Sequence, residues 1–168
     1  MRTLLTARLA NNIESTVLLA DGLKDLSTHL GSYGRSVLWI FDTNTAKLFK
    51  QLPPSHVVLE SGESQKNFAS LERIISTALE EGLARDGRII GFGGGVVCDL
   101  AGFAASVYMR GCTLTLVPTT LLAMVDASLG GKTAIDYRGV KNIVGSFYPA
   151  REVLISTGTR NFKGRAGH

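Results

Sequence analysis

The chain has 168 residues, of which 45% are hydrophobic and 19% are charged, so it is long and apolar enough for one domain with a buried core. Its formal net charge of +4 comes without a basic run and with few aromatic residues, which gives no support to a nucleic-acid partner. No apolar run approaches the ~20 residues of a membrane helix, and the first residues lack the apolar core of a signal peptide.

Cysteine usage points to a reducing compartment. Cys98 and Cys112 lie too far apart for a C-x-x-C pair, and two cysteines make no disulfide framework. We therefore expect a cytoplasmic protein.

In the first half of the chain, short strands and helices alternate. The apolar run 37–41 is typical of a buried parallel strand. Apolar spacing predicts strands over 3–9, 15–19, 37–41 and 56–59, the first two joined at Asn11-Asn12. It also predicts helices over 22–30, from after Asn44 through Leu48, and over 68–83. The last helix is expected to turn Leu71, Ile74, Ile75, Ala78 and Leu79 inward.

The central stretch reads as strand, glycine turn and helix. The apolar run 89–92 precedes Gly93, Gly94 and Gly95, and apolar residues then recur at helical spacing until Gly111 ends the helix. Glycine lets the backbone come close to a ligand, and a helix N-terminus offers unpaired N–H groups, so the pair suits a phosphate. The pattern is not G-x-G-x-x-G, and a tight turn without a ligand stays an alternative.

Several polar residues have both a functional and a structural interpretation. Asp42 follows a strand, where open α/β sheets contact ligands, but it would also cap the next helix. Asp99, one turn into its helix, would also complement the helix dipole. Glu63 and Lys66 read most simply as a solvated loop pair.

A second polar patch follows the strand 114–117 and a helical turn over 121–127. It contains Asp126, Ser128, Gly130 to Thr133, Asp136, Lys141 and Asn142. Gly131-Lys132-Thr133 does not make a P-loop, because the earlier glycine is missing and no strand feeds into it. A lysine beside Asp126 could bind an anion or assist proton transfer, and solubility is the alternative role.

These patterns predict an α/β fold: a Rossmann-like, mostly parallel sheet flanked by helices, with a phosphate or dinucleotide site at the glycine turn. Six blocks then resemble the 3-dehydroquinate synthase family, in the family's order, from about residue 15 to residue 157. The blocks are Gly93-Gly-Gly-Val-Val-Cys-Asp-Leu-Ala-Gly-Phe103, Tyr108-Met-Arg-Gly111, Val117-Pro-Thr-Thr-Leu-Leu-Ala123, Val125-Asp126, Gly130-Gly-Lys-Thr-Ala134 and Gly139-Val-Lys-Asn-Ile-Val-Gly145.

The resemblance implies a lyase of the shikimate pathway, which leads to chorismate and aromatic amino acids. Such enzymes hold NAD and a divalent metal, zinc or cobalt, and are cytoplasmic. They convert 3-deoxy-D-arabino-heptulosonate 7-phosphate into 3-dehydroquinate with loss of phosphate. NAD transiently oxidises one carbinol, which acidifies the neighbouring C–H so that phosphate leaves by elimination.

By position, the resemblance also implies site residues. Asp42 and Asn44 would contact the adenosine end of NAD, with Glu63 and Lys66 nearby. Backbone N–H groups of Gly94 and Gly95 would bind the pyrophosphate. The implied cofactor set further includes Gly93, Asp99, Thr119, Thr120, Asp126, Lys132 and Lys141.

The implied catalytic set lies at the junction of nicotinamide and substrate and consists of Asp126, Lys132, Lys141 and Asn142, with Arg110. Arg110 would reach the substrate phosphate of a neighbouring subunit, which implies a homodimer, and a guanidinium suits phosphate by its geometry.

The resemblance ends near residue 157. Family members continue with Leu-Pro, then Arg-Glu-Phe, then an Ala-Glu whose glutamate binds the metal. In this chain the Leu-Pro is missing, and Gly167 stands where the metal-binding glutamate is expected. The three histidines have no ligand spacing. We expect an NAD-binding domain over 1–157 and a divergent remnant of a helical metal-binding domain over 158–168, without metal ligands. The chain is then a truncated, inactive half of the enzyme.

Two alternatives remain open at the level of sequence. One is a stand-alone nucleotide-binding module without catalysis. The other is another sugar phosphate cyclase, or the NAD-binding half of a metal-dependent polyol dehydrogenase.

Overall fold

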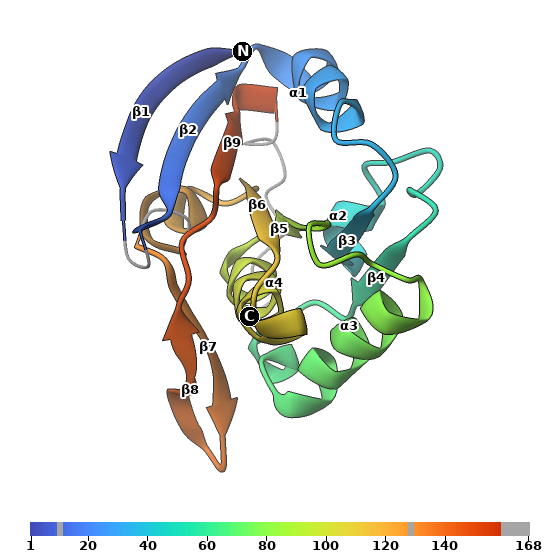
Figure 1. Ribbon diagram of the computed structural model, residues 1–168, viewed down its shortest axis with the longest axis vertical. Helices are drawn as coiled ribbons and strands as arrows, with labels where there is room; N and C mark the ends of the chain where they lie inside the picture. The colour runs from blue at the N-terminus through green and yellow to red at the C-terminus, as the bar shows by residue number, and fades with distance from the viewer. Residues whose placement is uncertain (10–11, 128–129, 159–168) are drawn as a thin grey trace.

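The computed structural model describes residues 1–9, 12–127 and 130–158. They form a central sheet in the order β1-β2-β9-β6-β5-β3-β4 and a separate ribbon of β7 and β8 (Figure 1). The strands of the sheet are β1 (Arg2–Arg8), β2 (Glu14–Ala20), β3 (Val37–Asp42), β4 (His56–Leu59), β5 (Arg88–Gly93), β6 (Thr113–Pro118) and β9 (Glu152–Ser156). Every pairing in this sheet is parallel except that of β1 with β2, which confirms the expected fold class.

Helices cover both faces of the sheet. They are α1 (Gly22–Gly31), α2 (Thr43–Ala46), α3 (Phe68–Glu80) and α4 (Gly95–Val107), with short turns η2 (Glu63–Gln65), η3 (Tyr108–Arg110) and the π-helical η4 (Ala123–Ala127). Because side chains alternate along a strand, Phe41 packs with Leu26 of α1 on one face. Ile40 packs with Leu100 of α4 on the other.

The ribbon consists of β7 (Lys132–Tyr137) and β8 (Val140–Phe147), which pair antiparallel. It packs against α4, and glycine is needed there, since a Cβ on Gly102 would collide with the side chain of Thr133. In Figure 1 the ribbon projects away from the sheet. Ile135 of β7 is buried in the core against α4, so the ribbon adds to the core at its base and forms a wall beside α4.

The structure corrects several expectations from sequence. Leu79 was expected to point inward, but its exposed fraction is 67%, and α3 ends at Glu80 rather than at residue 83. The ribbon and β9 were not predicted. Asn11, Ser128 and residues 159–168, which include most of the expected remnant domain, lie outside the described residues. Within the part of the chain that is described, no helix is long and apolar enough to cross a membrane.

Candidate dinucleotide site at the N-terminus of α4

The N-terminus of α4 carries unpaired backbone donors. The first helical hydrogen bond runs from the Cys98 N–H to the Gly94 carbonyl at 3.0 Å. The N–H groups of Gly95, Val96 and Val97 therefore precede any acceptor inside the helix, and Gly94 as N-cap supplies no side chain to bind them. Three donors and the positive end of the helix dipole are thus available to an anion.

The requirement for glycine differs among the three positions of the turn. A Cβ on Gly93 would lie 2.7 Å from Val97, so Gly93 lets α4 pack closely on β5. A Cβ on Gly94 would lie 3.4 Å from the Thr120 side chain. Gly95 has neither a positive φ nor any atom within 4 Å of a Cβ, so the protein's own packing does not require glycine there. Open space beside unpaired N–H groups suits a ligand that approaches the backbone closely.

Beside this turn, Lys66 and Asp99 form a buried ion pair. Lys66 Nζ lies 2.5 Å from Asp99 Oδ2, and the two side chains are 7% and 18% exposed. Burial raises the pKa of the Asp99 carboxyl. The Lys66 ammonium acts in the opposite direction, while the charges of Glu63 and Asp126 add to the rise. The interpretation of Lys66 as part of a solvated pair with Glu63 is wrong, because Lys66 turns inward to α4.

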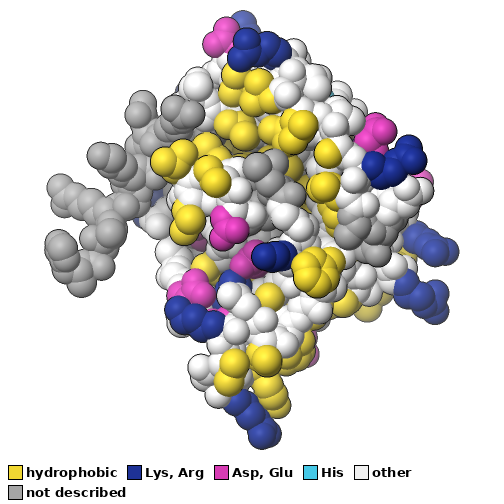
Figure 2. Space-filling view, turned by 90° about the vertical axis from the view of Figure 1, so that its left-hand side faces the viewer, with side chains coloured by type: hydrophobic (Ala, Val, Ile, Leu, Met, Phe, Trp, Pro, Cys, Tyr) yellow, Lys and Arg dark blue, Asp and Glu magenta, His cyan; other side chains and the backbone are white. Residues whose placement is uncertain are grey.

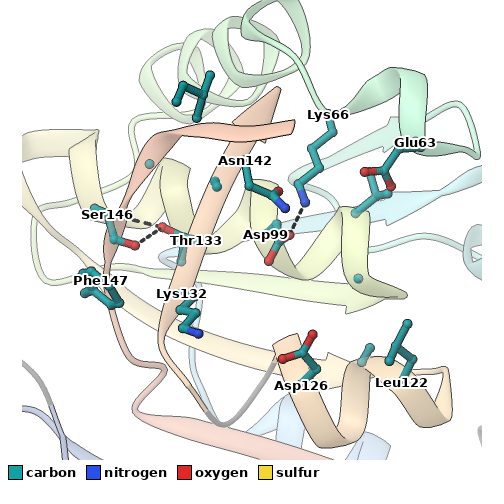
Figure 3. Close-up of a pocket in the computed structure, with 16 residues that line it drawn as sticks. Glu63, Lys66, Asp99, Leu122, Asp126, Lys132, Thr133, Asn142, Ser146 and Phe147 are labelled. Carbon is teal, nitrogen blue, oxygen red and sulfur yellow. Dashed lines mark hydrogen bonds and ion pairs between the residues drawn. The ribbon is translucent and has the colours of Figure 1, made fainter. Parts of the chain in front are cut away.

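A pocket of about 630 Å³ opens at this ion pair. Its walls are the first turns of α4, the segment at η2, the turn at η4 and the β7–β8 ribbon. Figure 3 shows Lys66, Asp99 and Asn142 pointing toward one another, with Lys132 and Asp126 at another side of the pocket. The predicted site residues that line it are Glu63, Lys66, Gly95, Asp99, Asp126, Lys132 and Asn142.

The rim of the pocket is apolar at several points. Leu122 and Phe147 both line the pocket and are 75% and 64% exposed. On the face that carries the ribbon and η4, Figure 2 shows hydrophobic side chains around a group of acidic and basic ones. The site thus combines charged groups in its interior with hydrophobic side chains at its edge.

Apart from Lys141, the remaining predicted cofactor residues lie at the carboxyl edge of the sheet or just after it. Strands β3, β5 and β6 end there side by side, and the Thr119 N–H donates to the Gly93 carbonyl at 2.9 Å. Thr119 is buried and Thr120 is exposed. This edge is where open α/β sheets form ligand crevices.

Asp42 has the capping role that the sequence left open. Its Oδ1 accepts from the N–H groups of Asn44 and Thr45 at 2.9 and 2.8 Å, and the Thr45 hydroxyl donates to the Phe92 carbonyl. Asp42 thereby fixes α2 to the end of β5. Asn44 is exposed at the same edge.

Two of the predicted catalytic residues, Lys141 and Arg110, do not line the pocket. Lys141 is exposed, next to Asn142 in β8. Arg110 lies beyond the C-terminal end of α4, a helix of about 20 Å by its rise per residue, so it is remote from this chain's own pocket. Met109 and Arg110 have φ of 47° and 63°, and both are exposed.

Sequence reasoning gave no role to Thr133, which it noted only within a polar patch, and it missed Ser146; both line the pocket from the ribbon. The Thr133 hydroxyl donates to the Ser146 carbonyl at 2.9 Å and lies 3.1 Å from the Ser146 hydroxyl. The signal that could have found them is the two-residue turn Arg138-Gly139 between two runs of strand-forming residues.

The described residues of this site provide neither a cluster of metal ligands nor a reactive thiol. In residues 1–9, 12–127 and 130–158, no three His, Cys, Asp or Glu side chains gather to hold a metal ion. Cys98 and Cys112 are free and buried, and burial raises the pKa of both thiols, that of Cys112 to about 11. Both therefore stay protonated and unreactive near neutral pH.

Together, the sheet order, the glycine turn and the pocket define a Rossmann-like α/β domain with a site suited to a phosphate-containing ligand. Solved structures of sugar phosphate cyclases share this fold. A 2-deoxy-scyllo-inosose synthase, solved with carbaglucose-6-phosphate, NAD+ and Co2+, superposes with a TM-score of 0.78 at 26% identity over 95% of this chain and 48% of its own. The 2-epi-5-epi-valiolone synthase of Streptomyces hygroscopicus, with NAD+ and Zn2+, gives 0.75 at 27% identity over 85% and 43%.

The family itself is defined by sequence. Residues 56–163 match the family described as 3-dehydroquinate synthase N-terminal, and the chain belongs to that family. The 3-dehydroquinate synthase of Prochlorococcus marinus is 40% identical over 93% of this chain and 42% of the relative. That of Helicobacter pylori is 51% identical over 65% of this chain and 32% of the relative. The chain thus spans less than half the length of these relatives.

Proposed function

We propose that this chain is the NAD-binding part of a 3-dehydroquinate synthase, with the NAD pyrophosphate bound at the first turn of α4. The observation that carries the proposal is the uncapped N-terminus of α4, which has free space at Gly95 and faces the pocket. The residues present fit the cofactor, because three unpaired N–H groups can bind pyrophosphate oxygens without displacing a side chain. Membership of the family and the NAD+ in two related structures support the choice of ligand.

In this proposal the carboxyl edge of the sheet holds the rest of the cofactor. Asp42 and Asn44 lie where the adenosine end would bind, with Asp42 Oδ2 left over from the cap. Thr119 and Thr120, which lie against Gly93 and Gly94, would line the cofactor cleft. The Lys66–Asp99 pair, with Glu63, lies next to the turn; because Asp99 already balances the Lys66 ammonium, the helix N–H groups are the main donors to the pyrophosphate.

We assign the substrate end to Asp126 and Lys132 at the other side of the pocket, together with Asn142 and its exposed neighbour Lys141 in the ribbon. The exposed Lys132 ammonium suits an anionic group of a sugar-acid phosphate, and Asp126 lines the same pocket as a carboxylate that can accept a proton. NAD, when bound, accepts a hydride from a substrate carbinol and later returns it. Leu122 and Phe147 give the rim of the pocket an apolar surface.

The whole protein's reaction is part of the same proposal. We assign it the conversion of 3-deoxy-D-arabino-heptulosonate 7-phosphate to 3-dehydroquinate, in the cytoplasm and as a homodimer in which Arg110 reaches the partner's substrate phosphate. Support comes from the names of the relatives and from the exposed position of Arg110 away from its own pocket. The described residues offer no cluster of side chains that could hold the divalent metal.

Calorimetric titration of the 168-residue chain with NAD tests the cofactor site. Gly95→Val fills the free space at the helix N-terminus, and we expect it to weaken NAD binding at least tenfold, on the order of one lost charge-assisted hydrogen bond. Gly31→Val is the matched control, since Gly31 has a negative φ and no atom within 4 Å of a Cβ but lies in α1. Equal affinities of Gly95→Val and wild type would contradict the proposed site.

Phosphate release from 3-deoxy-D-arabino-heptulosonate 7-phosphate, with NAD and zinc added, tests the reaction. Turnover by the chain would support the synthase activity directly. A chain that binds NAD without turnover would keep the cofactor role and remove catalysis from these 168 residues.

A further inference from the structure

The β7–β8 ribbon has a bulge around Asn142, a residue that lines the pocket. Ile135 pairs with Val144 and Tyr137 pairs with Val140, so three residues of β8 stand opposite the single residue Asp136. In this bulge Asn142 has a φ of 55°, a left-handed conformation that is uncommon for residues other than glycine. Such backbone outliers are concentrated at ligand sites, where surrounding contacts hold them in place.

Asp136 supplies the contact that holds this outlier. Its Oδ1 accepts the backbone N–H of Asn142 at 2.8 Å. Its own N–H donates to the carbonyl of Lys66 at 2.8 Å. Asp136 therefore joins the bulge on one side to the segment that carries the buried ion pair on the other.

By holding the bulge, Asp136 determines the direction in which the Asn142 side chain points. Asn142 lines the pocket, and Figure 3 shows it pointing toward Lys66 and Asp99. If the backbone left the left-handed region, the side chain would turn to another direction. We propose that Asp136 is a positioning residue that fixes Asn142 toward the ligand in this pocket, an inference whose binding readout depends on the proposed NAD site.

Amide hydrogen exchange of the ¹⁵N-labelled 168-residue chain tests the geometry without any ligand. In wild type the Asn142 N–H should exchange slowly. Asp136→Ala should speed its exchange roughly tenfold, about the effect of one lost hydrogen bond, and Asp136→Asn should restore protection because its amide oxygen still accepts. Asp86→Ala is the charge-matched control, since Asp86 is exposed on a turn. Unchanged exchange at Asn142 in Asp136→Ala would overturn the proposal.

NAD titration then separates positioning from a merely structural role. Asp136→Ala and Asn142→Ala should each weaken NAD severalfold, and the double variant should bind no more weakly than Asn142→Ala alone. Asn142→Gly adopts a positive φ without strain, so it keeps the chain folded, and adding Asp136→Ala to it should not change affinity. If the NAD affinity of a double variant fell by the product of the two single-variant losses, the two residues would act independently and the proposal would be overturned. If wild type binds no NAD, the proposed function fails, while the exchange experiment still decides the role of Asp136.

Discussion

Two clusters of charged side chains lie at opposite ends of the central sheet. At the carboxyl end, Lys66 pairs with Asp99 beside the uncapped helix α4. At the amino end, Arg88 at the start of β5 lies 3.2 Å from Glu152 at the start of β9. Both clusters join distant parts of the chain. They differ in what lies next to the charged groups.

The amino-end cluster is held together by contacts among its own side chains. Glu152 also accepts from the Tyr33 hydroxyl and lies 3.5 Å from His29 Nε2, and Arg88 donates to Thr115 and stacks 3.9 Å above the Tyr33 ring. At the carboxyl end, helix N–H groups and free space remain next to the ion pair. The difference indicates that the first cluster stabilises the fold, whereas the second is arranged around a ligand.

The largest effect on stability is expected at the carboxyl end. Lys66→Met leaves the Asp99 carboxylate buried without its partner, and breaking a buried pair typically costs about 3 kcal/mol of unfolding free energy. Urea denaturation measures the loss. A Lys66→Met variant as stable as wild type would contradict the buried pair.

The pH dependence of the same variant sharpens this prediction. Burial already raises the pKa of Asp99, and removing Lys66 removes the opposing influence, so the folded pKa rises further. A raised folded pKa means that stability is present at acid pH and lost as pH rises through that pKa. The deficit of Lys66→Met should therefore be larger at pH 7 than at pH 4, and an equal deficit at both would exclude this explanation.

A smaller loss of stability, without loss of function, is expected at the amino end. Glu152→Ala removes the acceptor of Tyr33 and Arg88, but Arg88 and Glu152 are about a quarter exposed, so screening limits the cost to about 1 kcal/mol. NAD affinity should stay at the wild-type value. Glu152→Gln, which keeps a hydrogen-bond acceptor, is the milder control. Weakened NAD binding in either variant would contradict the assignment of a purely structural role to the amino end.

The smallest effect concerns Asp42, which lies at the carboxyl end but also has a structural role. Asp42→Ala should lose about 1 kcal/mol through the missing cap. Asp42→Ser restores the cap but lacks the second carboxylate oxygen, so it should regain stability while NAD binding stays severalfold weaker. If Asp42→Ser bound NAD as tightly as wild type, the role of Asp42 would be limited to capping α2.

The sequence predicted those features of the fold that rest on local patterns. The apolar runs of β3 and β5 and the glycine turn before α4 were read correctly, because each pattern occupies one continuous stretch. The ribbon was missed, because the bulge at Asn142 interrupts its alternation and β8 is mostly exposed. Leu79 was misplaced, because helical spacing gives the width of an apolar stripe but not how much of it the sheet covers.

The candidate site was predictable by residue type but not by contact. Lys66 and Asp99 were both singled out, yet their pairing depends on how α4 packs beside η2, which no local pattern encodes. Asp136 was noted only as one member of a polar patch. Its acceptance of the Asn142 N–H follows from the register of the ribbon, which is a tertiary property.

The most direct test of the central claim is an NMR titration of the ¹⁵N-labelled chain with NAD. If the cofactor binds at the N-terminus of α4, the backbone amides of Gly95, Val96 and Val97 should show the largest shifts, while those around Arg88 and Glu152 stay in place. Shifts confined to other regions, or none at millimolar NAD, would contradict the account.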